Sequence, residues 1–335
     1  MHPDEAEFDV CGIGSALVDV LVEATVEQVL GCGLIKGSMQ LMDLEMAEQV
    51  HARAPGGVER SGGSVANTVA GLASLGARAG FIGKVADDRF GGVFAADLEA
   101  LGVTFARALG SGGTGRSLIL VTPDADRTMC TTLAVAATLG PDDLDEGIIA
   151  RSAVTYLEGY LWDEPQAKDA FRKAIAVAHG AGRRVAMSMS DPFCVDRHRR
   201  EFAHLATDHL DILLGNDAEL CSLMEVDDLE AACRKVRRPG LTVSVTRGPR
   251  GAWVFEGLDG PVVDVPVEGT PHVVDTTGAG DLFAAGFLFG LTRGADLERC
   301  ARLGNLGASE VISHLGARPE VPLATLAASL ASAPA

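Results

Sequence analysis

Val274-Asp-Thr-Thr-Gly-Ala-Gly-Asp281 runs directly into the apolar stretch Leu282-Phe-Ala-Ala-Gly-Phe-Leu-Phe289, and this junction decides the fold. The apolar stretch predicts a buried helix that begins at about Ala279. The first turn of such a helix has free N–H groups that point back at the glycine turn, and the helix dipole favours negative charge there. Small residues at the turn allow an anion to approach the backbone closely. The junction therefore predicts an anion hole formed by Gly278, Ala279 and Gly280.

Asp281 lies in the first turn of this predicted helix, beside the anion hole. A carboxylate there stabilises the start of a helix, so Asp281 also has a purely structural interpretation. Gly278 and Gly280, however, each cost up to ~1 kcal/mol relative to alanine in a helix, which makes them poor choices for stability alone. Glycines and an acid at an anion hole suit phosphoryl transfer, in which the hole holds the phosphate and the acid takes a proton from the attacking hydroxyl.

The rest of the chain alternates short apolar strands with helices, which predicts an α/β fold. Such alternation gives a doubly wound, largely parallel core sheet with helices on both faces. The strands are expected at Ala79–Val85, Val154–Tyr160, Val185–Ser190 and Ile212–Leu214, the helices at 66–76, Pro165–Gly180, 279–293 and 296–314, and antiparallel strands within 241–267. The β-rich segments near 15–60 and 104–135 are interrupted in sequence, so we expect them to combine into a small sheet that projects from the core.

The composition excludes several classes of protein. Hydrophobic residues make up 47% of the 335 residues and charged residues 22%, which is typical of a folded globular protein. The net charge of −18 repels phosphate backbones and anionic lipids, so we expect no nucleic-acid partner and no membrane partner. The seven cysteines form no C-x-x-C pair, and the acidic N-terminus lacks the features of a signal peptide. No apolar run approaches about 20 residues, so we expect a soluble, cytoplasmic protein.

Two other glycine turns are candidates for ligand-binding sites. Gly12-Ile-Gly14 begins like a dinucleotide fingerprint, but Leu17 stands where the third glycine belongs, which favours a plain turn between two strands. Gly62-Gly63 opens a second predicted helix, and alone it would be only a turn and a cap. The sequence contains no G-x-x-x-x-G-K-[ST] stretch and no metal-ligand spacing. Two helices opened by glycines are expected to face one cleft.

Four ordered motifs resemble those of the ribokinase/PfkB family of carbohydrate and nucleoside kinases. They are Gly62-Gly-Ser-Val-Ala-Asn67, Asn216-Asp-Ala-Glu219, Thr246-Arg-Gly-Pro-Arg-Gly251 and Asp275-Thr-Thr-Gly-Ala-Gly-Asp281, and they extend over nearly the whole chain. The resemblance implies a ribokinase-like α/β core with a small β-sheet lid, in one kinase domain of residues 1–335. Within the family, patches such as Ser15–Val20 and Val154–Leu161 are most similar to bacterial adenosine-kinase-like members.

The resemblance implies that the ATP γ-phosphate is transferred to the 5′-hydroxyl of a ribonucleoside, with adenosine as the expected acceptor and AMP as the product. The alternatives are a sugar kinase acting on ribose or fructose, a kinase of another nucleoside, and a non-catalytic ligand-binding regulator. The retained Asp281 and the intact anion hole count against the regulator. Mg²⁺ is the expected metal, with K⁺ as a second cation if a monovalent site is used. A monomer or a homodimer is expected.

The resemblance also assigns roles by position. The catalytic set is Asp281, Gly278, Ala279, Gly280 and Arg127. The substrate set is Asp19, Gly63, Ser64 and Asn67 for the ribose, and Met39, Met129, Leu133 and Leu161 for the base. The ATP set is Asn216, Thr246, Gly248, Gly251 and Asn305. Mg²⁺ would be held through water by Asn216 and Glu219, and a monovalent cation by Asp275 and Thr277.

These positions also have ordinary structural interpretations. Asp19 suits the end of a strand, and Asn216 with Glu219 suits a helix capping box. Arg127 suits an exposed hairpin, and Asn305 suits a solvated helix position. The four apolar residues of the substrate set suit the core. The sequence alone leaves these alternatives open.

Overall fold

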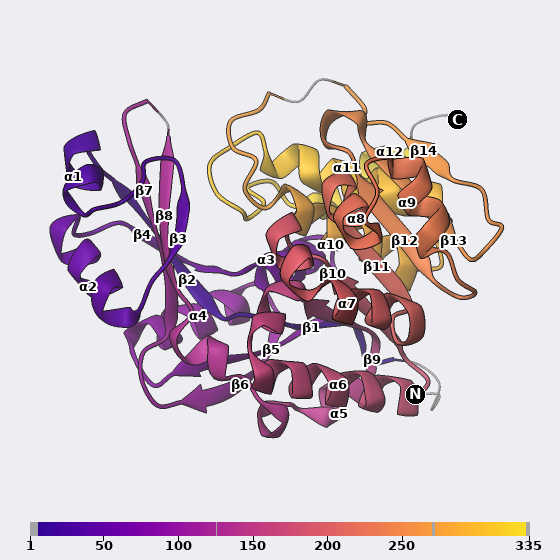
Figure 1. Ribbon diagram of the computed structural model, residues 1–335, viewed down its shortest axis with the longest axis horizontal. Helices are drawn as coiled ribbons and strands as arrows, with labels where there is room; N and C mark the ends of the chain where they lie inside the picture. Colours follow the sequence, from indigo (N-terminus) through magenta and orange to yellow (C-terminus); the bar gives the residue numbers. More distant parts are fainter. Residues whose placement is uncertain (1–5, 125, 270–271, 333–335) are drawn as a thin grey trace.

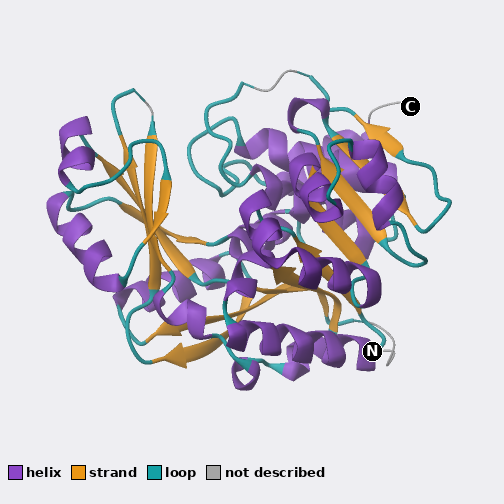
Figure 2. Ribbon diagram, viewed as in Figure 1, coloured by secondary structure: helices purple, strands orange, loops and turns teal. Residues whose placement is uncertain are grey.

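The computed structural model describes residues 6–124, 126–269 and 272–332, and these residues form two β-sheets (Figures 1 and 2). The larger sheet has nine strands in the order β14-β13-β12-β11-β10-β9-β1-β5-β6. The strands from β12 to β6 pair in parallel, whereas β13 and β14 extend the sheet antiparallel. The nine strands are β1 (Phe8–Ile13), β5 (Ala79–Ala86), β6 (Thr104–Gly110), β9 (Ser152–Glu158), β10 (Arg184–Ser188), β11 (Ile212–Asn216), β12 (Thr242–Thr246), β13 (Ala252–Glu256) and β14 (Val263–Val265).

The smaller sheet has five strands in the order β3-β8-β7-β2-β4 and stands apart from the core helices, on the left of Figure 1. These strands are β2 (Leu17–Glu23), β3 (Met39–Leu41), β4 (Val58–Gly62), β7 (Gly115–Val121) and β8 (Arg127–Thr132). All five come from the two segments that we expected to combine. One part of that prediction is wrong, because β6 at 104–110 is the edge strand of the larger sheet. Phe105 holds β6 there, since its ring packs against Phe81 and Phe94 of the core.

Helices cover both faces of the larger sheet (Figure 2), which confirms the predicted doubly wound, ribokinase-like α/β class. The helices are α1 (Val26–Gly31), α2 (Leu44–Arg53), α3 (Ser64–Ser74), α4 (Arg89–Ala100), α5 (Glu146–Ala150), α6 (Pro165–Gly180), α7 (Pro192–Asp208), α8 (Asp217–Met224), α9 (Leu229–Val236), α10 (Ala279–Thr292), α11 (Leu297–Val311) and α12 (Leu323–Ser332). Among the described residues, no helix combines the length and the apolar character that a membrane crossing requires.

Alternation along the strands explains why helices bind to both faces. On β10, Ala186 belongs to the apolar cluster shared with α3, α10 and α11, whereas Val185 and Met187 belong to the cluster shared with α5 to α9. Successive side chains of a strand point to opposite faces, so a strand that is apolar throughout needs cover on both sides. The parallel strands also direct their carboxyl ends to one edge of the sheet, where ligands bind in folds of this kind.

The turn after β1 connects the two sheets. A Cβ atom at Gly14 would come within 2.5 Å of Glu158 Oε2 and within 2.8 Å of the Val65 Cβ. A Cβ at Gly12 would come within 2.4 Å of the Val65 side chain. The two glycines are therefore required by close packing of α3 and β9 against this turn, in agreement with the prediction of a plain turn rather than a dinucleotide loop.

Candidate active site

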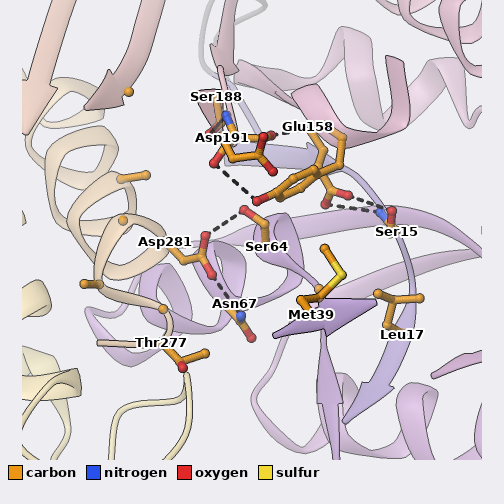
Figure 3. Close-up of a pocket in the computed structure, with 18 of the residues that line it drawn as sticks. Ser15, Leu17, Met39, Ser64, Asn67, Glu158, Ser188, Asp191, Thr277 and Asp281 are labelled. Atoms are coloured by element: carbon orange, nitrogen blue, oxygen red, sulfur yellow. Dashed lines mark hydrogen bonds between the residues drawn. The ribbon is translucent and has the colours of Figure 1, made fainter. Parts of the chain in front are cut away.

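A cavity of about 830 Å³ opens between the two sheets at the carboxyl ends of the parallel strands. Both sheets and the amino-terminal ends of α3 and α10 contribute to its wall (Figure 3). The structure brings most of the predicted site residues together here, namely Asp19, Met39, Gly63, Ser64, Asn67, Met129, Leu133, Asn216, Glu219, Thr246, Thr277, Gly278, Ala279, Gly280 and Asp281.

The N-terminus of α10 forms one end of the cavity. Gly278 has φ +79°, and a Cβ there would lie 2.7 Å from the Ala317 Cβ, so only glycine fits this turn. A Cβ at Gly280 would meet no atom within 4 Å, which leaves the space beside the first turn open. The helix has no side-chain cap, and Ala279 N donates to Thr276 O at 3.2 Å, so among the described residues the N–H groups of Gly280 and Asp281 stay available to an anion.

The Asp281 carboxylate is held by the neighbouring helix α3 (Figure 3). Ser64 Oγ donates a hydrogen bond to Asp281 Oδ1 at 2.6 Å, and Asn67 Nδ2 donates one to Oδ2 at 2.9 Å. Burial raises the pKa of Asp281, although these two bonds and the charge of Arg318 oppose the rise. The Asp281 carboxylate is therefore bound by α3 rather than by the N–H groups of its own helix, and the residue lines the cavity.

Asp19 lies on β2, across the cavity from α10. A Cβ on Gly62 would come within 2.3 Å of the Asp19 carboxylate, so the glycine leaves the space that this carboxylate fills. Burial, together with the charge of Asp281, raises the pKa of Asp19 to about 7, while Arg318 opposes the shift. Asn67 Oδ1 is buried and has no hydrogen-bond partner among the described residues. Asp19 and Asn67 both line the cavity, and the Asn67 Oδ1 acceptor is unfilled among the described residues.

Glu158, at the carboxyl end of β9, also lines the cavity, although no sequence motif predicted it. Its carboxylate accepts hydrogen bonds from Ser15 Oγ at 2.6 Å, Ser15 N at 3.2 Å and Val65 N at 3.3 Å. Burial raises the pKa of Glu158 to about 7 against the effect of these bonds. Its position was the available signal in the sequence, because a carboxylate at the carboxyl end of an apolar parallel strand lies at the edge of the sheet where ligands bind.

Asn216 and Glu219 form the capping box that was the structural alternative, and they also line the cavity. Asn216 Nδ2 donates to Glu219 Oε1 at 2.6 Å, and Asn216 N donates to Oε2 at 3.0 Å. Burial, with the charges of Asp191 and Asp217, raises the pKa of Glu219 to about 7. A cation would relieve this repulsion, and Mg²⁺ needs only one or two carboxylates because it keeps several waters. The donor set therefore fits a hydrated Mg²⁺.

Arg127 lies outside the cavity lining and contacts Asp275 and Thr277 instead. Its Nη1 is 2.5 Å from Asp275 Oδ2 and 3.2 Å from Thr277 Oγ1, whereas its Nη2 is buried without a partner among the described residues. The alternative of an exposed hairpin arginine is wrong, since only 14% of this side chain is exposed.

Besides Arg127 and Asp275, four predicted site residues do not line the cavity. Leu161 is 1% exposed and packs in the core with Trp162, so the core interpretation holds for it. Asn305 donates to the carbonyl oxygens of Val265 and Pro266 at 3.1 and 3.2 Å, which makes it a brace for that loop. Gly248 and Gly251 shape the turn between β12 and β13, where both have positive φ.

An apolar wall forms the part of the cavity that belongs to the smaller sheet. Met39 and Leu41 are alternate residues of β3, so both face the same side, and Met129 pairs with Met39 on β8. The complete wall consists of Leu17, Met39, Leu41, Met129 and Leu133. Leu17 and Leu41 were not predicted, although the period of two along a strand would have added Leu41 to Met39.

Comparisons with known proteins identify the family of the chain. Residues 32–324 match the pfkB family carbohydrate kinases. The crystal structure of an adenosine kinase from Sinorhizobium meliloti is 45% identical to the chain, with a TM-score of 0.88 over 97% of this chain and 100% of that one. A probable sugar kinase from Rhizobium etli CFN 42 is 40% identical, with a TM-score of 0.88 over 97% and 99% of the two chains.

A further relative is similar to the chain in amino-acid sequence. An uncharacterized sugar kinase of Archaeoglobus fulgidus is 32% identical over 255 residues, which are 75% of this chain and 98% of the relative. The family match covers most of the chain, including both glycine-opened helices, and the relative covers 75% of it. The chain therefore belongs to the pfkB family of carbohydrate kinases, and it is a phosphotransferase.

Proposed function

We propose that the protein transfers the γ-phosphate of ATP to the 5′-hydroxyl of a ribonucleoside, and that adenosine is converted to AMP. The observation that carries the proposal is the arrangement of one cavity. It has a carboxylate at an open anion hole at one end and an apolar wall at the other, and Asp19 and Asn67 lie between them. A nucleoside has the same order of groups, with a reacting hydroxyl, a sugar diol and a flat apolar base.

Asp281 would take the proton of the attacking hydroxyl. Its two hydrogen bonds to α3 fix the carboxylate beside the Gly278–Gly280 turn, where the transferred phosphate would lie. The N–H groups of that turn would stabilise the charge on the moving phosphate. Proton transfer from a positioned base contributes typically ~10²–10⁴ in rate. The Nη2 of Arg127, which has no partner among the described residues, is a further donor that would bind the transferred phosphate while Nη1 remains on Asp275.

The triphosphate of ATP would lie along Asn216, Glu219 and Thr246, which line the side of the cavity built from β11 and β12. Asn216 and Glu219 would hold Mg²⁺ through water. When bound, Mg²⁺ neutralises part of the negative charge of the phosphates. All seven cysteines are free, which suits a reducing compartment, and we place the reaction in the cytoplasm.

The apolar wall supports a base rather than a free sugar as part of the acceptor. Met39, Met129 and Leu133 offer no hydrogen bonds, whereas a sugar would need polar partners for each buried hydroxyl. Methionine adapts its shape and makes favourable contacts with aromatic rings, which suits an adenine. The smaller sheet would act as a lid that closes this wall over the base and excludes water from the phosphate.

A sugar kinase is the second candidate, and two of the proteins compared above are described as sugar kinases. One local observation favours it. The hydroxyls of Ser117 and Thr131 also line the cavity, and they form a 2.9 Å hydrogen bond with each other. The pair retains one donor and further acceptor positions, which a sugar hydroxyl could use in the space assigned to the base.

Steady-state kinetics with adenosine, 2′-deoxyadenosine, ribose and fructose test the proposal. Removal of the 2′-hydroxyl leaves Asp19 without one donor, at a cost of about 1–3 kcal/mol, so 2′-deoxyadenosine is expected to be roughly ten- to a hundred-fold poorer in kcat/KM. Asp19→Ala is expected to lower kcat/KM for adenosine and to reduce the difference in kcat/KM between adenosine and 2′-deoxyadenosine. If ribose or fructose outperforms adenosine on the unmodified enzyme, the protein is a sugar kinase instead.

A further inference from the structure

The Asp275 carboxylate is surrounded by donors of the protein itself. Its Oδ1 accepts hydrogen bonds from Thr277 N at 3.1 Å and Thr277 Oγ1 at 2.7 Å. Its Oδ2 accepts one from Gly316 N at 2.8 Å and lies 2.5 Å from Arg127 Nη1. A carboxylate offers about four lone-pair positions in all. The four donors therefore use the whole capacity of Asp275.

The two charges of this group are buried together. The side chain of Asp275 is 6% exposed and that of Arg127 is 14% exposed. Burial alone would raise the pKa of Asp275, but the bonds from Gly316 and Thr277 and the charge of Arg127 lower it below its ordinary value. The guanidinium cannot be deprotonated in a protein, so it supplies a permanent positive charge to the carboxylate.

This arrangement does not fit the monovalent cation that the family resemblance implies at Asp275 and Thr277. A K⁺ ion needs oxygen atoms that face it, whereas both oxygens of Asp275 already face N–H and O–H donors. A second positive charge in contact with the same carboxylate would also be repelled by Arg127, since like charges about 4 Å apart repel strongly where burial lowers the effective dielectric.

We propose that the Arg127 guanidinium replaces the monovalent cation in this protein. Arg127 extends from β8 of the smaller sheet to the loop that leads into α10, so it joins that sheet to the segment before the anion hole. It acts there as a positioning residue: it neutralises Asp275, which in turn binds the backbone of Thr277 directly before Gly278. The conformation of the segment before the anion hole consequently depends on a side chain of the protein and not on K⁺.

The thermal unfolding of the free protein tests this proposal without reference to activity. The unfolding midpoint is measured in KCl and in tetramethylammonium chloride at the same ionic strength, because the larger cation cannot enter a site of this size. The wild-type protein is expected to have the same midpoint in both salts. In Arg127→Met the carboxylate loses its counter-charge, and K⁺ at about ten times its dissociation constant is expected to raise the midpoint by about 2 °C.

Two variants serve as controls. Arg127→Lys keeps a positive charge near Asp275 and is expected to show no response to K⁺. Arg89→Met removes a different ion pair of the smaller sheet, between Arg89 and Glu59, and is likewise expected to show none. If Arg127→Met does not fold, Arg127→Gln removes the same charge and takes its place in the comparison. A rise of the wild-type unfolding midpoint that is specific to K⁺ overturns the proposal. An unfolding midpoint of Arg127→Met that does not rise with K⁺ also overturns it.

Discussion

Ser64 Oγ and Asp281 Oδ1 are joined by a 2.6 Å hydrogen bond between the first turns of two different helices. Each helix is opened by a glycine with positive φ, Gly63 before α3 and Gly278 before α10. The two glycine motifs, which are more than 200 residues apart in the chain, therefore meet at a single carboxylate. The position of the proposed base is fixed by packing of helix against helix, and the helix dipoles add to the anion hole at the same place.

Replacement of the proposed base tests the chemistry most directly. Asp281→Asn retains the size of the side chain and is expected to leave substrate binding nearly unchanged, because the hole and the ribose partners remain. Turnover is expected to fall at least ~10²-fold, since an amide cannot take the proton. Single-turnover kinetics together with a binding measurement would separate the two effects. Near-normal turnover would show that another group accepts the proton.

Removal of the Ser64 hydroxyl is expected to change the pH dependence. The hydrogen bond from Ser64 stabilises the charged form of Asp281 and so lowers the pKa of this carboxylate. In Ser64→Ala the pKa of Asp281 is expected to rise, and the acid limb of kcat/KM is expected to move to higher pH. The pH profiles of both proteins, measured with saturating Mg²⁺, give the comparison. An unchanged limb would mean that the limb belongs to a different group.

Glu219→Gln tests the assignment of the hydrated metal. The variant lacks the charge that would attract Mg²⁺, so the Mg²⁺ concentration for half-maximal activity is expected to rise about tenfold or more. Glu230→Gln is the matched control, because Glu230 is an exposed acid that is absent from the cavity lining and pairs with Arg234. If Glu219→Gln alters thermal stability alone, the residue serves only as a helix cap.

The pH dependence of stability tests the buried carboxylate of Glu158. Its pKa in the folded protein is raised from about 4.5 to about 7, so the folded state holds a proton that the unfolded state has lost between these values. The free energy of unfolding is therefore expected to fall as the pH rises through this window. Glu158→Gln is expected to make the fall shallower in urea titrations, whereas a change at exposed Glu99 is expected to have no effect. An equal slope in Glu158→Gln would contradict the assignment.

The parts of the fold that the sequence predicted well are those in which local pattern and burial agree. Proline at the start and glycine at the end set the bounds of Pro165–Gly180, and the structure has a helix with these bounds. The apolar run after Gly278 likewise predicted α10 to within one residue. The pattern of apolar residues predicts these helices because the same residues form the core that packs against the sheet.

The sequence predicted less well where an interaction between distant segments decides the outcome. β6 was assigned to the smaller sheet because its composition is β-prone, but its sheet is chosen by contacts of Phe105 with α4 and β5. Glu158 gives no motif, and its role depends on Ser15 and Val65 from other elements. Leu161 and Asn305 were placed in the site by position, whereas core packing and a loop brace account for them. Such choices depend on tertiary contacts that no local window contains.

The final prediction concerns the glycine beside the proposed ribose partner. A Cβ at Gly62 would come within 2.3 Å of the Asp19 carboxylate, so Gly62→Ala is expected to displace that carboxylate. Loss of its hydrogen bonds to the acceptor should raise the KM for adenosine about tenfold or more, with little effect on the KM for ATP, whose proposed partners lie on the other side of the cavity. Gly92→Ala is the control, since a Cβ there meets no atom within 4 Å and the residue lies within a helix, where alanine is the better helix former. Equal KM values for adenosine in the wild type and Gly62→Ala would remove Asp19 from the acceptor site.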